Sequence, residues 1–295
     1  MPKAALIVMP SSYHKMTSQN KSTIAQIFKQ HDYTVKWAPH AQTCEKAFGI
    51  LDNEKAQDLH QAFAQQPDII MALRGGYGSE RLLPKLNWGK IKKSKSLFVG
   101  CSDTTVFQNA YLAKTGKASI TGMIATFLIN NTYSKTTKNF FQLLSGQDVD
   151  LKKFSTLAPG HATGTVIGGN LSCFITLIGT PYMPKLKGKI LLLEEVHEAP
   201  FRVDRMLTHL KTAGVFDQIN GVILGTFHEC VHPKENEDIE VHQVLKNFFA
   251  NFKIPVITDI PYGHSPQHIC LPLGTKAIID TQKNILHIDA PSKKR

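Results

Sequence analysis

The sequence lacks several features that would place it in other classes of protein. No run of roughly 18 apolar residues occurs in its 295 residues, so a membrane-spanning helix is not expected. The five cysteines are odd in number and include no CxxC pair, which argues against a disulfide framework and a thiolate zinc site. No GxGxxG, GxxxxGK[ST] or GxSxG motif is present, so neither a nucleotide-binding loop nor an α/β-hydrolase elbow is indicated.

The charge and the N-terminal residues narrow the classes of partner and the cellular compartments to be expected. The chain has 34 basic and 23 acidic residues and a net charge of +11. The lysine clusters are short and no nucleic-acid-binding motif accompanies them, so we expect attraction for small anionic substrates and no nucleic-acid partner. The apolar run at 4–9 is short and no cleavage site follows it, so it is read as a buried strand. A reducing cytoplasm is the simplest compartment for such a chain.

The first half of the sequence alternates between strand and helix patterns. Apolar runs at 4–9 and 68–73 are typical of parallel strands buried on both faces, and 33–37 predicts a further strand. Apolar residues recur at helical spacing at 23–30 and 54–63. This pattern predicts a doubly wound parallel sheet, in which functional loops follow the carboxyl ends of strands.

The second half predicts another α/β unit. Residues 131–160 are polar and rich in lysine, and we interpret them as a connection. The predicted domains are therefore 1–135 and 161–295, with a linker at 136–160. In the second domain, strand patterns lie at 189–193, 222–224 and 255–260. Helical patterns lie at 200–214 and 240–252, and a C-terminal hairpin is predicted at 277–280 with 284–289.

Residues 100–103, Gly-Cys-Ser-Asp, join an apolar run directly to a helical pattern. A hydroxyl at such a tight strand-to-helix turn is held out of the sheet edge, and backbone N–H groups of the helix point towards it. Ser102 is therefore a candidate nucleophile. Serine is also a favoured helix cap, and the local spacing leaves both roles open. The glycine-rich loop at 75–78 follows a neighbouring strand and could form a second wall of an oxyanion pocket.

Glu194 and His264 are two further polar residues that stand just past apolar runs. Serine needs a base within hydrogen-bond reach, an imidazole suits that task, and a carboxylate behind the imidazole fixes its tautomer. The order Ser, Glu, His is one that catalytic triads use. The alternatives are that Glu194 pairs with Arg202 or Arg205 and that His264 is a turn residue.

No set of ligands with metal-binding spacing emerges from the remaining histidines. His197 stands beside Glu198, and His228 lies near His232, but neither pair has a third ligand at a recognised spacing. We therefore expect no metal and no other cofactor.

Several short motifs together resemble one known family, in its order and over nearly the whole chain. They are Pro-Ser-Ser at 10–12, Arg-Gly-Gly-Tyr-Gly at 74–78, Gly-Cys-Ser-Asp at 100–103, Gly-Gly-Asn-Leu-Ser at 168–172, Gly-Thr-Pro-Tyr at 179–182, Leu-Glu-Glu at 193–195, Arg-Val-Asp-Arg-Met-Leu at 202–207, Gly-His at 263–264 and Leu-Pro-Leu-Gly at 271–274. With these motifs the chain resembles the LD-carboxypeptidase family of serine peptidases, which includes the microcin C self-immunity peptidases.

The resemblance implies a fold and a reaction. It implies a Rossmann-like parallel-sheet N-terminal domain, a C-terminal α/β domain with barrel-like β structure, and a site between them. Ser102 would be the nucleophile, His264 the general base and Glu194 the residue that orients it. The oxyanion hole would be formed by the N–H groups of Asp103 and Gly76. Members commonly form homodimers, and LD-carboxypeptidases release the terminal D-alanine from murein tetrapeptides during cytoplasmic recycling of peptidoglycan.

The chain departs from the family pattern in places. It has Thr-Gly-Met at 121–123 where many members have His-Gly-Pro-Met, so this part of the pocket wall is expected to differ. Glu195 stands where aspartate is usual, and we favour Glu194 because it occupies the matched position. Cys101 is disfavoured as nucleophile because such a turn presents one side chain. Arg74 and Arg205 are candidates for binding a substrate carboxylate, because arginine binds carboxylates in bidentate fashion.

Two other functions remain open from the sequence. One is a peptidase of the microcin C immunity type, which an aromatic platform beside the pocket would favour; Trp37 and Trp88 are the residues to locate. The other is a non-catalytic binding protein on the same two-domain scaffold.

Overall fold

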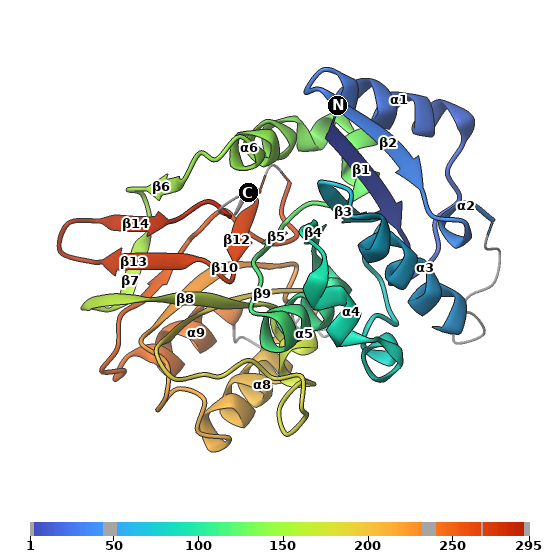
Figure 1. Ribbon diagram of the computed structural model, residues 1–295. Coiled ribbons are helices and arrows are strands. Elements are labelled where there is room, and N and C mark those ends of the chain that lie inside the picture. Colours follow the sequence, from blue (N-terminus) through green and yellow to red (C-terminus); the bar gives the residue numbers. More distant parts are fainter. Residues whose placement is uncertain (1–2, 44–51, 232–239, 267, 292–295) are drawn as a thin grey trace.

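The protein, described here by a computed structural model, consists of two sheets with helices packed on them (Figure 1). The structure describes residues 3–43, 52–231, 240–266 and 268–291. The first sheet, sheet A, has six strands in the spatial order β12 (Leu271–Leu273), β5 (Ser119–Thr121), β4 (Leu97–Gly100), β3 (Ile69–Ala72), β1 (Lys3–Val8) and β2 (Tyr33–Trp37).

Strands β1 to β5 are parallel to one another, which confirms the doubly wound parallel sheet predicted for the first half. Strand β3 is buried along its whole length, as its continuous apolar run predicts. Figure 1 shows α1 and α6 on one side of the sheet and α3, α4 and α5 on the other. The helices of this half are α1 (Ser18–Lys29), α2 (His40–Thr43), α3 (Asp52–Gln65), α4 (Trp88–Lys93), α5 (Thr105–Thr115) and α6 (Ser134–Leu144), with short 3₁₀ turns η1 (Glu80–Lys85), η2 (Ser102–Thr104), η3 (Ala125–Ile129) and η4 (Asn131–Tyr133).

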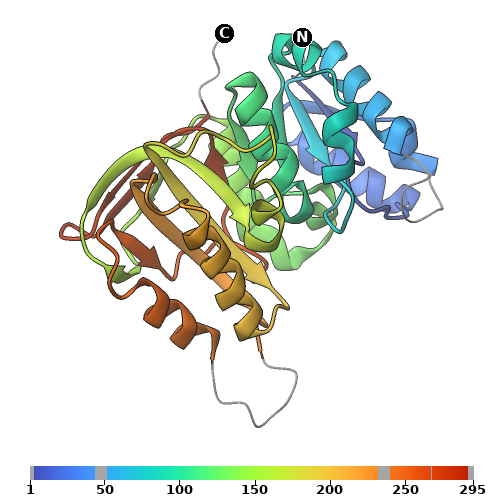
Figure 2. The ribbon, with the colours of Figure 1, turned by 90° about the horizontal axis from the view of Figure 1, so that it is seen from below.

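The second sheet, sheet B, has eight strands and curls into a half-barrel (Figure 2). Its four central strands, β8 to β11, are parallel, and antiparallel strands flank them on both sides. The predicted C-terminal hairpin is confirmed as β13 and β14. In spatial order the strands are β6 (Val149–Leu151), β14 (Ile285–Ile288), β13 (Lys276–Asp280), β8 (His161–Asn170), β9 (Lys189–Val196), β10 (Gly221–His228), β11 (Val256–Thr258) and β7 (Ser155–Ala158).

The helices of the second half are α7 (Leu171–Ile175), α8 (Pro200–Thr212) and α9 (Val241–Phe249). In the view from below, α8 and α9 cover one face of sheet B (Figure 2). Phe216, just after α8, packs edge-to-face on Phe249 of α9 with ring centroids 5.8 Å apart. The apolar residues of both helices are buried, among them Leu207 of α8 and Leu245 of α9.

The two halves of the chain exchange elements. Strand β12 follows β11 of sheet B in the sequence, but it pairs antiparallel with β5 at the edge of sheet A. Residues 136–160, predicted as a linker, contain most of α6 and the strands β6 and β7, and both strands join sheet B. The predicted domain limits stay predictions, and the segment that carries His264 runs from one sheet to the other.

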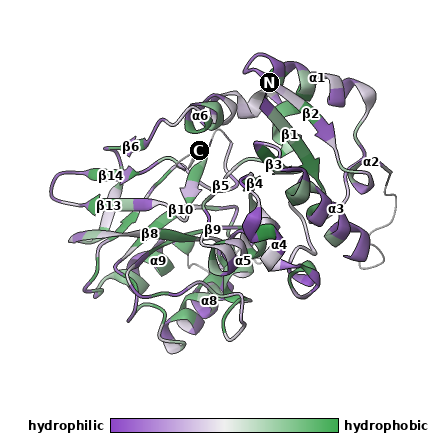
Figure 3. Cartoon of the chain, in the orientation of Figure 1, coloured by the Kyte–Doolittle hydropathy of each residue, from purple (hydrophilic) through white to green (hydrophobic). Residues whose placement is uncertain are grey.

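Hydropathy follows this arrangement. Strand β1 is largely hydrophobic, whereas much of α3 is hydrophilic (Figure 3). Residues from Ala5 to Met9 are at most 4% exposed. Within the described residues, no helix combines the length and the apolarity that crossing a membrane requires.

Candidate active site

Ser102 stands at a sharp turn between β4 and α5. Strand β4 ends at Gly100, Cys101 is extended with φ of −163°, and Ser102 has φ of +59°. A positive φ is unfavourable for a residue with a Cβ, so the surroundings must hold it. Thr104 does so by donating its N–H (3.3 Å) and its hydroxyl (2.9 Å) to the Cys101 carbonyl. The turn presents the Ser102 side chain at the carboxyl edge of sheet A.

The glycine-rich loop after β3 packs directly against this turn. A Cβ added to Gly75 would lie 2.8 Å from Ser102 Cβ and 3.1 Å from Ser102 Oγ. Gly76 has φ of +112°, and a side chain there would overlap Ser12. Both positions therefore require glycine. In the described part of the chain the Gly76 N–H has no hydrogen-bond acceptor, so it is available as a donor.

Strand β9 and the loop after β11 bring Glu194 and His264 together. Nδ1 of His264 lies 2.8 Å from Oε2 of Glu194, and the two side chains are 23% and 2% exposed. Gly263 allows this approach, because it has φ of +133° and a Cβ there would lie 2.9 Å from Glu194 Oε2. The structure thus pairs two of the predicted residues, 70 positions apart in the sequence.

The charges around His264 favour its protonated form. Burial opposes the imidazolium, but the hydrogen bond and charge of Glu194, together with the charge of Glu195, outweigh it, so the pKa of His264 lies above 6.5. Glu195 is otherwise engaged, since it accepts hydrogen bonds from Asn170 Nδ2 (2.8 Å) and Ser172 N–H (2.7 Å). Of the two adjacent carboxylates, Glu194 is the one that can orient the imidazole.

Hydrogen bonds connect the histidine loop, residues 261–270, to the serine turn. The ring of His268 has Nδ1 3.0 Å from the Ser265 carbonyl and Nε2 2.7 Å from the Gly122 carbonyl. Gly122 in turn donates its N–H to the Gly100 carbonyl at 3.1 Å. The end of β5 thereby lies between the serine turn and the loop that carries His264.

Cys101 and Ser102, the two adjacent candidates for a nucleophile, lie in different environments. Burial and the charge of Glu194 raise the pKa of Cys101, which keeps its thiol protonated and unreactive. Ser102 is only partly buried. Its hydroxyl makes no hydrogen bond to His264 within the described residues, and such contacts commonly tighten only in the substrate complex.

The two predicted carboxylate-binding arginines lie in different places. Arg74 directly precedes the glycine-rich loop, and its Nη1 lies 3.5 Å from the Tyr13 carbonyl. Arg205 lies on the exposed face of α8, with its guanidinium 5.5 Å from the centre of the Phe201 ring. Arg74 therefore belongs to the segment that contacts Ser102, and Arg205 does not.

His197 and His228, two of the histidines without a metal-ligand spacing, lie against the carboxylate of Glu229. His197 Nδ1 is 3.1 Å from Glu229 and His228 Nε2 is 3.7 Å from it. In the ranges that the structure describes, no three His, Cys, Asp or Glu side chains are arranged to hold a metal ion. His232 lies outside those ranges.

Comparison with known proteins assigns the family. The model of the LD-carboxypeptidase N-terminal domain matches residues 6–122, and that of the C-terminal domain matches residues 163–279. The chain belongs to the LD-carboxypeptidase family. The murein tetrapeptide carboxypeptidase of Pseudomonas aeruginosa is 31% identical over 296 residues, covering 94% of this chain and 93% of that protein.

Two further similarities extend the comparison. The microcin C7 self-immunity protein MccF of Escherichia coli is 29% identical over 270 residues, covering 79% of this chain and 77% of that protein. The crystal structure of the muramoyltetrapeptide carboxypeptidase from Oxalobacter formigenes has a TM-score of 0.86 and 28% identity, covering 98% of this chain and 99% of that one. The LD-carboxypeptidase fold predicted from the motifs is therefore confirmed.

The LD-carboxypeptidase motifs did not predict several polar side chains around the site. The motifs give a role to the backbone N–H of Asp103 but none to its carboxylate, and they give no role to His268. Thr121, where many family members have histidine, lies with its Oγ1 2.8 Å from the Tyr262 hydroxyl. This contact ties the end of β5 to the histidine loop, so the altered motif lies against the segment that carries His264. The sequence signals this contact only in that Thr121 belongs to the segment, 121–123, that departs from the family motif.

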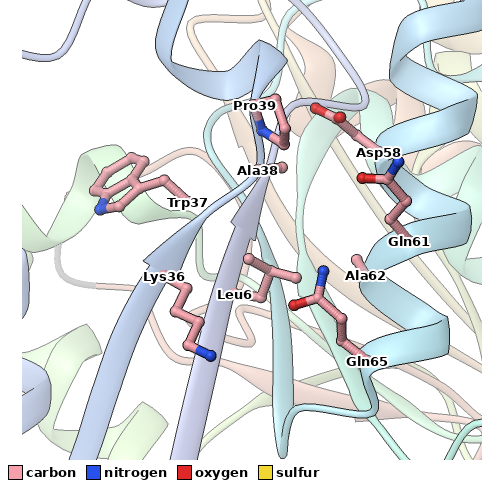
Figure 4. A pocket seen from close by; sticks show the side chains of 9 residues that line it. All are labelled: Leu6, Lys36, Trp37, Ala38, Pro39, Asp58, Gln61, Ala62 and Gln65. Atoms are coloured by element: carbon pink, nitrogen blue, oxygen red, sulfur yellow. The ribbon is translucent and has the colours of Figure 1, made fainter.

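A separate small pocket lies between β1, β2 and α3 (Figure 4). Asp58, Gln61 and Gln65 of α3 face the strands across it, and its volume is about 80 Å³. Drug-sized ligands occupy pockets of roughly 300 Å³ or more, so this one is too small for a tetrapeptide. None of the predicted LD-carboxypeptidase site residues lines it.

Proposed function

We propose that this chain is a serine-type LD-carboxypeptidase that releases the terminal D-alanine from murein tetrapeptides. The observation that carries this proposal is the pairing of His264 with the buried Glu194, whose charge also acts on Cys101, the residue before a serine held at positive φ. Support comes from the family and from the Pseudomonas aeruginosa relative, which is named for murein tetrapeptides.

In the proposed reaction, Ser102 attacks the carbonyl of the scissile amide while His264 takes the hydroxyl proton. The tetrahedral oxyanion accepts hydrogen bonds from the N–H groups of Gly76 and Asp103. His264 then gives its proton to the amine of the departing D-alanine, which leaves an acyl-enzyme. Water, deprotonated by His264, releases the shortened peptide and restores Ser102. Glu194 stabilises the imidazolium that forms in each half-reaction.

Recognition of a chain end requires a cation near the scissile bond. We propose Arg74 for the terminal carboxylate, because it adjoins the loop that contacts Ser102 and because a guanidinium can bind a carboxylate through two hydrogen bonds. Arg205 is the weaker candidate, since it stacks on Phe201 at the surface of α8.

The test is incubation of the purified chain with murein tetrapeptides that carry diaminopimelate or lysine at the third position. Mass spectrometry should detect release of one D-alanine per peptide. Ser102→Ala should abolish release, since removing the nucleophile of a triad lowers kcat by about 10⁶-fold. A tetrapeptide ending in L-alanine serves as the stereochemical control. Absence of release from every peptide, or equal release by Ser102→Ala, would rule out the proposed reaction.

A peptidase of the microcin C immunity type is the second candidate. Trp37 lies on edge strand β2, three strands away from β4, and Trp88 packs on Phe107 and Tyr182, so neither tryptophan is placed beside Ser102. An aromatic pair does adjoin the histidine loop: Phe127 and Tyr133 stack with centroids 4.1 Å apart, and both rings meet His268 edge-on. Hydrolysis of an aspartyl sulfamoyl adenosine in preference to the tetrapeptides would favour this candidate.

Two properties complete the proposal. A cytoplasmic location is supported by the cysteines, because all four within the described ranges are free thiols. A homodimer is proposed from the family resemblance, and light scattering on the purified chain tests it. A non-catalytic binding protein would instead bind tetrapeptide without turnover, and would do so equally well with alanine at position 102.

A further inference from the structure

The carboxylate of Asp103 is a junction between three strand-end loops. Its Oδ2 accepts hydrogen bonds from the Ser11 hydroxyl (2.5 Å), in the loop after β1, and from the Ser79 N–H (2.9 Å), after β3. Its Oδ1 accepts from the Gly78 N–H at 3.2 Å. The Ser79 hydroxyl donates to the Asp103 carbonyl at 2.6 Å. Asp103 itself belongs to the turn after β4.

These contacts are buried and involve neutral donors. Asp103 is 7% exposed, and Ser11 and Ser79 are fully buried. In the described part of the chain the carboxylate has no cationic partner. Hydroxyl and N–H dipoles stabilise its charge, and so does its position in η2, at the N-terminal end of α5. An ionised carboxylate can accept all three hydrogen bonds at once, and an amide cannot.

The tied loop is the one expected to supply an oxyanion donor. Residues 74–79 form neither helix nor strand, and Gly76 and Gly78 have φ of +112° and +113°. Two anchors fix them: Ser12 accepts the Tyr77 N–H at 3.0 Å, and Asp103 accepts the next two N–H groups along the chain. The Gly76 N–H stands just before these anchors. Without them, flexible glycines would leave its direction undefined.

We propose that the Asp103 side chain is a positioning residue that sets the separation of the two oxyanion donors, its own N–H and that of Gly76. This inference rests on the proposed function, because it assigns the oxyanion hole a rigid support. By joining the serine turn to the glycine-rich loop, the carboxylate keeps both donors directed at the oxyanion before substrate arrives. Preorganised donors of this kind stabilise the transition state more than the bound substrate.

The test compares Asp103→Asn with the unmodified chain in two assays. With the tetrapeptide, kcat and kcat/KM should fall together by about 10²-fold and KM should change little, because the loss is confined to the transition state. With a fluorophosphonate that phosphonylates Ser102 and develops an oxyanion, the labelling rate should fall by a similar factor. Unchanged kcat and an unchanged labelling rate would overturn the proposal.

The second assay separates the two proposals. If the unmodified chain labels at Ser102 but does not cleave the tetrapeptide, the substrate assignment fails and the labelling rates still test Asp103. If Asp103→Asn raises KM and leaves kcat unaltered, the carboxylate acts in substrate binding and the positioning role is refuted.

A matched control distinguishes positioning from a general loss of stability. Asp58 is also buried, at 3% exposure, and accepts hydrogen bonds from the N–H and Nδ1 of His40, away from Ser102. Asp58→Asn should retain kcat and the labelling rate. If Asp103→Asn does not fold, Ser11→Ala and Ser79→Ala replace it. Ser11→Ala removes one hydrogen bond to the carboxylate, and Ser79→Ala removes the hydrogen bond between the same loops that ends on the Asp103 carbonyl. Each should lower kcat several-fold at constant KM, and full activity in both would refute the proposal.

Discussion

At the scale of single residues, the proposed activity depends on whether the imidazole of His264 is protonated. Glu194 is almost completely buried, and His264 is the charged partner that it contacts within the described residues. The pair raises the pKa of His264 although burial opposes this. An imidazole with a raised pKa is a stronger base, but a larger fraction of it is protonated and inactive at neutral pH.

The acid limb of the pH profile should report this pKa. Because His264 must be neutral to accept the Ser102 proton, kcat/KM should fall as the pH drops through a value above 6.5. Glu194→Gln removes the charge that raises the pKa, so the limb should move to lower pH. The plateau should fall by roughly 10³-fold or more, since the imidazolium loses its stabilising partner. Measuring kcat/KM from pH 4 to 9 tests both effects.

Glu195→Gln is the control for this experiment. Glu195 influences His264 only through its charge, so the limb should move less and the plateau should remain close to that of the unmodified enzyme. A limb that stays in place in Glu194→Gln would contradict the assignment of His264 as base. The same raised pKa has a consequence for folding: protonated His264 stabilises the native state below pH 6.5, and this contribution is lost as the pH rises through the native-state pKa.

At the scale of elements, the segment between β11 and β12 determines the geometry of the base. It leaves sheet B after Thr258, passes His264, and enters sheet A at Leu271. His268 fastens its middle, since both ring nitrogens lie within hydrogen-bond distance of backbone carbonyls. The ring is 1% exposed and lies edge-on to Phe127 and Tyr133.

Replacing His268 by alanine should therefore displace His264 without touching it. Burial lowers the pKa of His268, so its neutral ring donates its one N–H to either the Gly122 or the Ser265 carbonyl. That carbonyl loses its partner, and a buried unsatisfied carbonyl destabilises the fold by about 1–3 kcal/mol. A shift of His264 by about 1 Å should lower kcat by up to about 10²-fold. Steady-state kinetics and urea denaturation measure the two effects. His287→Ala is the control, because that histidine pairs with Asp150 and Asp289 on sheet B. An unchanged kcat in His268→Ala would show that the loop does not need this fastening.

The sequence predicted the elements more completely than their junctions. Apolar runs located β3 and β9, and the helical pattern after residues 100–103 forms α5, which ends before Gly116, with φ of +73°. Local patterns report burial of one segment against an unspecified partner, so they predicted Ser102, Glu194 and His264 as strand-end residues. They could not show that Asp103 bonds Ser11 and Ser79, because such pairings depend on which strand ends are neighbours. For the same reason β12 could not be assigned to sheet A.

At the scale of the whole molecule, the two halves share structure that ties them together. Strand β12 extends sheet A, and Asn109 of α5 bonds β8 of sheet B in both directions. Its Nδ2 donates to the Gly168 carbonyl at 2.8 Å, and its Oδ1 accepts the Gly168 N–H at 2.9 Å. Since Asn109 is 1% exposed, these bonds are made away from water. The site between the sheets therefore depends on their docking.

This docking predicts that both halves unfold in one transition. The two tryptophans, Trp37 and Trp88, lie in the first half, and Trp88 also packs on Tyr182 of the second half. Their fluorescence therefore reports the first half and its contact with the second, whereas far-UV circular dichroism reports the whole chain. In urea the two signals should coincide, although a chain of this length often unfolds in steps. Asn109→Ala removes both bonds to Gly168 and should lower the free energy of unfolding by about 1–3 kcal/mol and separate the two curves. Asn53→Ala, which removes an exposed contact with Lys85, should change it by less than about 0.5 kcal/mol. Two separate transitions in the unmodified chain would mean that the sheets are independent units and that the Glu194–His264 pair and Ser102 are joined by loop contacts alone.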